Sequence, residues 1–359
     1  MKAVLLTGHG GLEKLVYRED VPVPQLARGE VLVRVGAAGV NTTDINTRTG
    51  WYSKVVSNNT KALAPQIEAL DKRTEGESWA GAALNFPRIQ GADVCGHIVR
   101  ASEDVDPKRI GERVIIEPCL RATRDQSSFN FSYFGSECDG GFAQYAKVVV
   151  EAAHKIDSVL SDAELASFPC AYSTAENLLT RSRVAAGERV LITGASGGVG
   201  SAAIQLARRR GAKIIAVAST SKAHKVMALG ASNVIPRGSS LITALGPNSV
   251  DVVIDVVGGQ AWSERLDVLV PGGRYATSGA IAGPMVEMDL RTLYLKDISL
   301  FGCTRLDSEV FINLIEYIER SDIQPVIAQT FPLRDIAEAQ ETFLLKKHTG
   351  KIVLIPPVD

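Results

Sequence analysis

The second half of the chain alternates between short apolar runs and amphipathic stretches. The run Arg189–Thr193 is apolar and β-branched, as in a buried strand, and residues 202–210 place Ile204 and Leu206 on one side, as in a helix that packs on a sheet. This pattern predicts strands at 189–194, 213–218, 233–235, 251–256, 273–278 and 295–301, and helices at 198–210, 222–229 and 260–269. Such alternation predicts a parallel, doubly wound α/β sheet.

The first half is rich in predicted strands, and helices follow it. Strands are expected at 4–6, 15–17, 30–35, 91–99, 113–116 and 147–150. Ser161–Glu164 fits a capping box at the start of a helical region that extends to Val184, and Pro169 opens its second segment. After the alternating region, helices at 308–320 and 334–346 and a last strand at 351–355 resume another domain.

Two segments, 53–86 and 117–139, interrupt this pattern. The first is polar and holds one short helix candidate at Leu63–Leu70, and the second is aromatic and polar. Loops this long without periodicity are either functional or mobile. We interpret both segments as shaping a pocket, and a surface excursion is the alternative for the first.

A glycine-dense turn, Gly194–Gly200, lies between the strand and the helix that open the alternating region. Gly197 lets the backbone approach a phosphate, Gly200 lets the helix lie close to the strand, and the helix N-terminus offers unpaired N–H groups to negative charge. Ala195 stands where the usual signature has its first glycine. We expect a nucleotide pyrophosphate to bind at Gly197, Gly198, Val199 and Gly200, and a tight turn without a ligand is the alternative.

Length and composition indicate the number of domains and argue against several classes of partner and site. A length of 359 residues favours two domains, and 45% hydrophobic with 22% charged residues is ordinary for a globular protein. The net charge of −1 argues against nucleic acid as the main partner. The five cysteines are odd in number and lack a C-x-x-C pair, which disfavours disulfides and a thiolate metal cage. Without a signal-like start or a run long enough to span a membrane, we expect a cytoplasmic protein.

The end of the second strand of the alternating region bears on which nicotinamide cofactor is used. An acidic residue there would bind the ribose 2′-hydroxyl of NAD, whereas a cation suits the 2′-phosphate of NADP. The strand ends in Ser219-Thr-Ser-Lys222, without Asp or Glu, and Lys225 and Arg237 follow. Two cations would neutralise a phosphate, and the hydroxyls of Ser219 and Ser221 would donate to its oxygens. This favours NADP over NAD, and an ordinary exposed lysine at a helix start is the alternative for Lys222.

Several motifs, in order and spacing, resemble the medium-chain dehydrogenase/reductase superfamily and within it the zinc-independent quinone oxidoreductase branch. They are Gly39–Asp44, Arg48–Tyr52, Pro87–Gly96, Gly111–Val114, Gly140–Tyr145, Gly194–Gly200, Asp255–Gly259 and Gly350–Leu354. The short-chain dehydrogenases also carry a Thr-Gly-x-x-x-Gly-x-Gly turn, but they place it near the N-terminus and add a Tyr-x-x-x-Lys motif. None of the eight tyrosines here has a lysine four residues later, so that family is set aside.

The resemblance implies a β-rich, GroES-like catalytic domain made from residues 1–154 and 307–359, with a Rossmann-type NADP-binding domain at 155–306. The active site would lie in the cleft between them. Cofactor contacts carried over from the family are Thr174, Val257, Gly258, Ser278 and Gly279 near the nicotinamide, with Ser219, Lys222 and Arg237 at the adenosine end. Relatives often form homodimers or dimers of dimers through an edge strand, here around Ser299–Cys303.

Zinc relatives hold their catalytic metal with a Cys, a His and a second Cys. Asn41 stands in place of the first Cys, Ala92-Asp93 stands in place of His-Glu, and only Cys170 matches a ligand position. Because catalytic zinc requires three protein ligands, we expect no metal.

Three residues are expected to act on the substrate by resemblance. Tyr52 matches a family tyrosine and would donate to the substrate oxygen, with simple packing as the alternative. Asn41 would orient the substrate or the nicotinamide, and Thr43 aligns with a proton-relaying hydroxyl. The branch often has a second tyrosine where this chain has Asn46, so strict quinone specificity is not implied.

The leading hypothesis is therefore an NADPH-dependent reductase that passes hydride to a quinone or to an activated double bond of a small-molecule substrate. An enone or quinone delocalises charge onto its oxygen, so hydrogen-bond donors suffice without a Lewis acid. The alternatives are an alcohol or aldehyde dehydrogenase of the same superfamily and a non-catalytic NADPH-binding protein.

Overall fold

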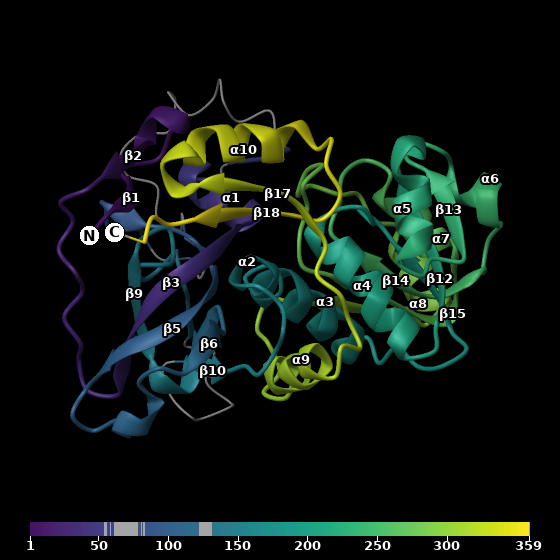
Figure 1. Ribbon diagram of the computed structural model, residues 1–359. Coiled ribbons are helices and arrows are strands. Elements are labelled where there is room, and N and C mark those ends of the chain that lie inside the picture. The colour runs from purple at the N-terminus through teal and green to yellow at the C-terminus, as the bar shows by residue number, and fades with distance from the viewer. Residues whose placement is uncertain are drawn as a thin grey trace. The chain divides into compact units, whose positions relative to one another are not determined.

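The computed structural model describes residues 1–53, 56–57, 59–60, 78–79, 81, 83–121 and 131–358. The chain divides into two compact units (Figure 1). Unit 1 comprises the described residues within Met1–Val56, Lys61–Cys170 and Ile315–Asp359, and unit 2 comprises those within Ser57–Thr60 and Ala171–Leu314. The short helix predicted at Leu63–Leu70 lies outside the described residues.

Unit 1 is built mainly from strands. Its elements are β1 (Ala3–Leu6), η1 (Leu12–Lys14), β2 (Leu15–Arg18), β3 (Glu30–Val40), α1 (Thr42–Thr49), β4 (Arg88–Ile89), β5 (Asp93–Ala101), η3 (Pro107–Arg109), β6 (Arg113–Ile116), β7 (Cys119–Arg121), β8 (Phe131–Tyr133), β9 (Tyr145–Val149), η4 (Val150–Ala152), β10 (Ala153–Lys155), α2 (Asp162–Leu165), β17 (Ile327–Pro332), η6 (Leu333–Asp335), α10 (Ile336–Leu345) and β18 (Lys351–Ile355).

The main sheet of unit 1 joins the two ends of the chain. Its order is β10-β6-β5-β3-β18-β17, and β9 also pairs with β3. The long strand β3 lies between β5 and β18, antiparallel to both. Figure 1 shows α10 lying along β17 and β18. Alternate residues of β3, such as Val31 and Val33, are fully buried in a core that Ile98 and Ile352 share, so the hydrophobic pattern of the strands fixes the register.

Unit 2 is the predicted doubly wound domain. Its elements are α3 (Pro169–Arg181), β11 (Arg189–Ile192), α4 (Gly198–Arg209), β12 (Lys213–Ala218), η5 (Thr220–Lys222), α5 (Ala223–Ala228), β13 (Asn233–Pro236), α6 (Leu241–Leu245), β14 (Val250–Asp255), α7 (Trp262–Asp267), β15 (Leu269–Thr277), α8 (Leu290–Leu295), β16 (Ser299–Gly302) and α9 (Val310–Glu319). Helices α3 and α9 cross the boundary with unit 1. The sheet is parallel in the order β13-β12-β11-β14-β15-β16, which confirms the predicted fold class.

The chain passes from unit 1 to unit 2 after Cys170 and returns to unit 1 after Leu314, whereas the sequence predicted these boundaries at residues 154 and 306. Helix α2 stays with unit 1 because it packs on β3 and β5. Asp162 at its start also forms an ion pair with Arg113 of β6 at 2.6 Å. The capping box predicted at its N-terminus is present, with Ser161 and Glu164 bonded reciprocally.

Three helices, α1, α6 and α8, were not predicted from the sequence. Helix α1 was not predicted, because its eight residues are almost all polar and show no apolar stripe; most are nevertheless buried. The strand predicted at 295–301 is observed only at Ser299–Gly302, and Leu295 is instead the last residue of helix α8. That helix starts at Asp289, whose side chain accepts a hydrogen bond from the backbone N–H of Arg291. This capping side chain stabilises the start of α8, while the predicted run keeps the shorter strand β16.

The turn between β11 and α4 explains why two of its glycines are not equivalent. A Cβ at Gly200 would lie 2.6 Å from Ala195 Cα and against the carbonyl oxygen of Gly194, which are backbone atoms that cannot move aside. A Cβ at Gly197 would meet only Gly194 O, at 3.4 Å, with φ at −81°. Close approach of helix and strand therefore requires Gly200 but not Gly197.

We expect Gly200→Ala to lower the free energy of unfolding by about 1–3 kcal/mol, because the added methyl forces α4 away from β11. The matched control, Gly197→Ala, should cost less, at most about 1 kcal/mol, because it loses only the preference for glycine over alanine at the N-cap. Guanidinium unfolding followed by circular dichroism measures both variants. Equal stability of the two would contradict this account of the turn.

Candidate active site

The predicted pyrophosphate residues lie at the N-terminus of α4. Gly197 is the N-cap, and its backbone N–H donates to Gly194 O at 3.0 Å, which closes the turn. The next three residues, Gly198, Val199 and Gly200, form the first turn of the helix, where backbone N–H groups have no intrahelical acceptor. This arrangement fits a pyrophosphate, since these donors and the helix dipole favour negative charge.

The predicted adenosine-end residues follow two neighbouring strands. Ala218 of β12 pairs with Pro236 of β13, so Ser219 and Arg237 leave the sheet side by side. The hydroxyls of Ser219 and Ser221 are 3.3 Å apart. The pKa of Lys222 is lowered, mainly by burial and then by the positive charges of Arg237 and Lys225. Cations thus gather beside two hydroxyls, a chemistry that suits a phosphate monoester.

The predicted nicotinamide-end residues lie in the loops that follow β14 and β15. The backbone N–H of Ala282 donates to Val257 O at 2.8 Å, which ties the two loops together. Gly258 and Gly279 line a cavity of about 260 Å³. The Ser278 hydroxyl is buried without a hydrogen-bond partner among the described residues, so it has capacity for a ligand.

Thr174 lies on α3 and is the one partly exposed residue between Leu165 and Leu179. A ligand can therefore reach its hydroxyl from solvent, whereas its neighbours along the helix are buried.

The sequence analysis missed what holds the β14 loop in place. Asp255 is fully buried and accepts hydrogen bonds from Thr193 Oγ1 at 2.5 Å, Tyr275 OH at 2.6 Å and the backbone N–H of Val257 at 2.9 Å. Arg265 lies 3.5 Å from the same carboxylate and donates to Gly258 O at 3.0 Å. The loop that carries Val257 and Gly258 is thus fixed by one buried carboxylate.

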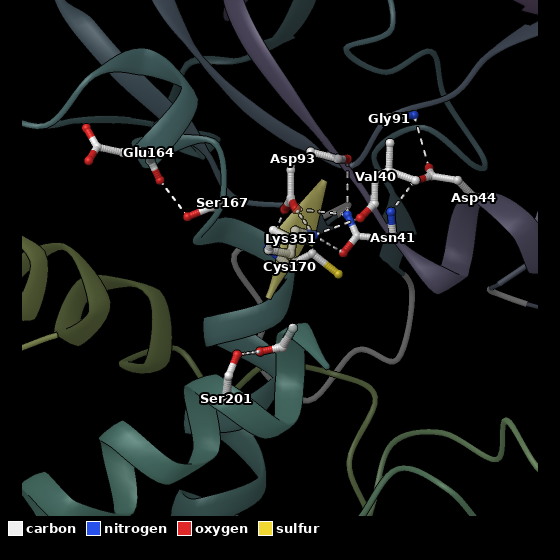
Figure 2. A network of polar contacts seen from close by, with 12 residues as sticks. Val40, Asn41, Asp44, Gly91, Asp93, Glu164, Ser167, Cys170, Ser201 and Lys351 are labelled. Atoms are coloured by element: carbon white, nitrogen blue, oxygen red, sulfur yellow. Dashed lines mark hydrogen bonds and ion pairs between the residues drawn. The ribbon is translucent and has the colours of Figure 1, made fainter. Parts of the chain in front are cut away.

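In unit 1, Asn41 belongs to a buried polar network (Figure 2). Lys351 Nζ donates to Asn41 Oδ1 at 2.5 Å, Asp93 Oδ2 at 2.6 Å and Val40 O at 3.1 Å. Asn41 Nδ2 donates to Asp93 Oδ2 at 2.9 Å and to Gly39 O at 3.3 Å. The backbone N–H of Cys170 donates to Asp93 Oδ1 at 2.5 Å, so three distant parts of the chain meet on one carboxylate.

This network constrains what Asn41 has left for a substrate. Both N–H groups of its amide are donated within the protein, and one lone pair of Oδ1 accepts from Lys351. The remaining capacity of the side chain is the second lone pair of Oδ1. Its direct action on substrate stays a prediction, and the structure gives it a clear architectural role.

Asp44 ties the start of α1 to the loop before β5. Its carboxylate accepts from the backbone N–H groups of Asn41 at 2.7 Å and Gly91 at 3.3 Å. Burial raises its pKa to about 7, partly offset by these hydrogen bonds and by the positive charge of Lys351.

Helix α1 brings Thr43 and Tyr52 together. Tyr52 OH donates to Thr43 Oγ1 at 3.1 Å. Burial raises the pKa of Tyr52 above its usual value, so the phenol remains a proton donor at neutral pH. Asn46, on the same helix, has a buried Oδ1 with no hydrogen-bond partner among the described residues. This acceptor, where the family often has a tyrosine, was not expected to take part.

Cys170 is capped by a second tyrosine that the sequence analysis did not single out. Tyr133 OH lies 2.9 Å from Cys170 Sγ, and Ala92 packs against both. Burial, reinforced by the negative charge of Asp93, raises the pKa of the Cys170 thiol to about 12, so it is protonated at neutral pH. In the described part of the chain, no three His, Cys, Asp or Glu side chains gather as a metal site.

The three predicted catalytic residues and their network thus lie in unit 1, and the predicted cofactor residues lie in unit 2. Asp93 and Lys351 stood inside the family motifs, but neither was given a role. Tyr133 lay in an irregular segment without any pattern to mark it. Among the described residues, no helix is both long enough and apolar enough to cross a membrane.

Lys351→Met should lower the free energy of unfolding by about 3–5 kcal/mol, because it leaves the Asp93 carboxylate buried without a counter-charge. The control is Lys147→Met, whose 3.0 Å pair with Glu30 is partly exposed and should contribute at most about 1 kcal/mol. Urea unfolding measures both, and similar losses in the two variants would show that the buried network is not the stronger constraint.

Comparison with known proteins agrees with this geometry. The family described as "Alcohol dehydrogenase GroES-like domain" matches residues 27–158, and that described as "Zinc-binding dehydrogenase" matches residues 198–320. The acryloyl-coenzyme A reductase of Metallosphaera sedula is 30% identical, with 99% of each chain covered. The quinone oxidoreductase of Homo sapiens is 29% identical, covering 99% of this chain and 98% of its own length.

A solved structure assigned as an alcohol dehydrogenase, from Sinorhizobium meliloti, has a TM-score of 0.89 and 46% identity, covering 99% of this chain and 97% of its own. These matches extend over both units and confirm the resemblance that the motifs predicted. The chain is an oxidoreductase that belongs to the medium-chain dehydrogenase/reductase superfamily, in its quinone oxidoreductase-like branch.

Proposed function

We propose that this oxidoreductase uses NADPH, works without zinc, and passes hydride to a quinone or to the activated double bond of an α,β-unsaturated carbonyl compound. The observation that carries the proposal is the buried network of Asn41, Asp93 and Lys351, which stands where zinc relatives hold their metal. The homologues named above, an acryloyl-coenzyme A reductase and a quinone oxidoreductase, both act on conjugated acceptors.

The residues at the zinc-ligand positions do not fit a catalytic zinc. Asn41 offers an amide that is already bonded to Asp93 and Lys351, and Ala92 offers a methyl group. Cys170 is held as a neutral thiol, whereas zinc binds the thiolate. The carboxylate of Asp93 is committed to an ammonium, an amide and a backbone N–H. A set of three available ligands is therefore missing from these positions.

The residues of unit 2 do fit a dinucleotide with a 2′-phosphate. The turn at the start of α4 supplies N–H donors to the pyrophosphate, and Lys222 with Arg237 supplies positive charge beyond β12. The position where NAD enzymes carry an acidic residue holds Ser219 instead.

When bound, NADPH supplies a hydride, and the acceptor's conjugation carries the resulting charge to its oxygen. Tyr52 keeps its proton at neutral pH and donates a hydrogen bond toward that oxygen. Thr43 Oγ1 lies 3.1 Å from the phenol oxygen, and when the threonine hydroxyl rotates to donate its own proton to that oxygen, the O–H of Tyr52 is freed for the substrate. In this scheme, no Lewis acid is needed to stabilise the negative charge that develops on the acceptor's oxygen, whether the acceptor is acyclic or a ring.

We further propose that the protein forms a homodimer, or a dimer of dimers, through β16. This strand ends the parallel sheet and leaves one edge without a partner in the described chain. Leu300 on the strand is 40% exposed, and Leu290 and Leu295 of α8 are 61% and 71% exposed. Pairing of two such edges would cover both the backbone groups and the apolar side chains.

Two other functions remain as alternatives to test. One is an alcohol dehydrogenase, which the assignment of the Sinorhizobium structure favours. The other is a non-catalytic protein in which the cofactor residues bind NADPH but no substrate is turned over.

The purified protein should oxidise NADPH with at least one acceptor in a panel of quinones, enones and enoyl thioesters, and a zinc chelator should leave the rate unchanged.

Tyr52→Phe should lower kcat by about 100-fold while leaving the KM for NADPH within twofold, because it removes only the proton donor. Initial-rate assays that follow the absorbance of NADPH measure both kcat and the KM for NADPH. Alcohol oxidation that requires zinc, or cofactor binding without any turnover, would replace the proposal by one of the alternatives.

Lys222→Ala should raise the KM for NADPH by about tenfold or more and leave the KM for NADH within about twofold, since only NADPH carries the 2′-phosphate. Lys213→Ala is the matched control, because this exposed lysine starts the same strand, β12, at its opposite end. Initial-rate kinetics with each cofactor decide it. A wild-type enzyme that prefers NADH would contradict the assignment.

A further inference from the structure

The two irregular segments of unit 1 meet in an aromatic cluster made of Trp79, Phe131 and Tyr133. The ring centroids of Trp79 and Tyr133 are 4.3 Å apart with a tilt of 33°, and Phe131 meets Trp79 edge-on at 5.1 Å. The backbone N–H of Trp79 also donates to Ser136 Oγ at 3.5 Å. Contacts of this kind join parts of the chain that neither hydrophobic periodicity nor a shared element connects.

The aromatic cluster packs against the candidate site of unit 1. Tyr133 packs on Ala92 and Cys170, and Trp79 packs against that group. The phenol of Tyr133 is anchored on Cys170 Sγ, and the backbone N–H of Cys170 is anchored on Asp93. The cluster is thereby linked to the same buried carboxylate that positions Asn41.

Tyr52 belongs to the same neighbourhood. After burial, the charged form of Cys170 raises the pKa of Tyr133, and Tyr52 contributes in the same direction. The pKa of Tyr52 also responds to Cys170. The phenol of Tyr52 and that of Tyr133 therefore both interact electrostatically with one thiol, and Tyr133 also contacts it at 2.9 Å.

We propose that Trp79 is a specificity-determining residue. It strengthens the binding of flat, conjugated ring acceptors by stacking on them, and it leaves the binding of small acyclic acceptors unchanged. This inference rests on the proposed function. Tyr133 is buried and fixed by its bond to Cys170, whereas Trp79 is partly exposed. Because the indole packs on Tyr133 and Phe131, its exposed part is held in place and loses little side-chain entropy on binding.

The choice of acceptor follows from ring electrostatics and shape. The face of an indole is electron-rich, and a quinone fused to benzene rings is flat and electron-poor, so the two stack favourably. An acyclic enal such as crotonaldehyde has too little area to gain from such stacking. Trp79 should therefore affect binding of the ring acceptor and not the chemical step, which Tyr52 serves.

The test compares wild type, Trp79→Ala and Trp79→Phe with phenanthrenequinone and crotonaldehyde as acceptors. We expect Trp79→Ala to raise the KM for phenanthrenequinone about tenfold, with kcat and the KM for crotonaldehyde within about twofold. Trp79→Phe should recover most of the loss. The matched control is Phe86→Ala, which removes an aromatic ring from the same irregular segment, where it packs edge-on against His9 at 4.9 Å.

Equilibrium dialysis of phenanthrenequinone without NADPH provides a readout that needs no turnover. Saturable binding to wild type that weakens about tenfold in Trp79→Ala supports the inference even if no acceptor is reduced, a result that would defeat only the proposed function. Unchanged quinone binding in Trp79→Ala overturns it. Equal losses for both acceptors, or an equal effect of Phe86→Ala, also overturn it, because Trp79 would then act only in holding the fold.

Discussion

The carboxylate of Asp93 is fully buried, and the candidate site of unit 1 depends on what surrounds it. A charge in such a place is stable only with a counter-charge and a full set of hydrogen bonds. Lys351 supplies the charge, and Asn41 and the backbone of Cys170 supply hydrogen bonds. The end of β3, the start of β5, the start of β18 and the start of α3 therefore converge on one pair of oxygens. The position of Asn41 is a consequence of this electrostatic constraint.

The same constraint explains how much of the fold the sequence could predict. Unit 2 follows from local patterns, because buried parallel strands are short apolar runs and the helices between them are amphipathic. Helix α1 has no such pattern, since its buried residues are polar and are held by tertiary hydrogen bonds, such as Arg48 to Gln340 at 2.9 Å. Only the folded chain provides these partners, so no local periodicity marks the helix.

The candidate site divides in the same way. The phosphate-binding turn was predictable because its glycines, strand and helix are adjacent in sequence. The pairing of Asp93 with Lys351 joins residues that are 258 positions apart, and the pairing of Trp79 with Tyr133 joins two segments without periodicity. Resemblance to a family pointed to Asn41, Thr43 and Tyr52, but it could not show that both N–H groups of Asn41 are already donated within the protein.

In both units, a buried aspartate at one terminus of a strand holds the neighbouring loop in place. Asp93 begins β5 and binds a lysine, an amide and a backbone N–H, and Asp255 ends β14 and accepts from a tyrosine, a threonine and a backbone N–H. In each case the carboxylate collects donors from elements that are distant in sequence, and the loop beside it loses conformational freedom before any ligand arrives. Preorganisation of this kind lowers the entropy cost of binding. Buried carboxylates can therefore hold a site rigid through hydrogen bonds alone, as Asp93 does for Asn41 and Asp255 does for the loop after β14.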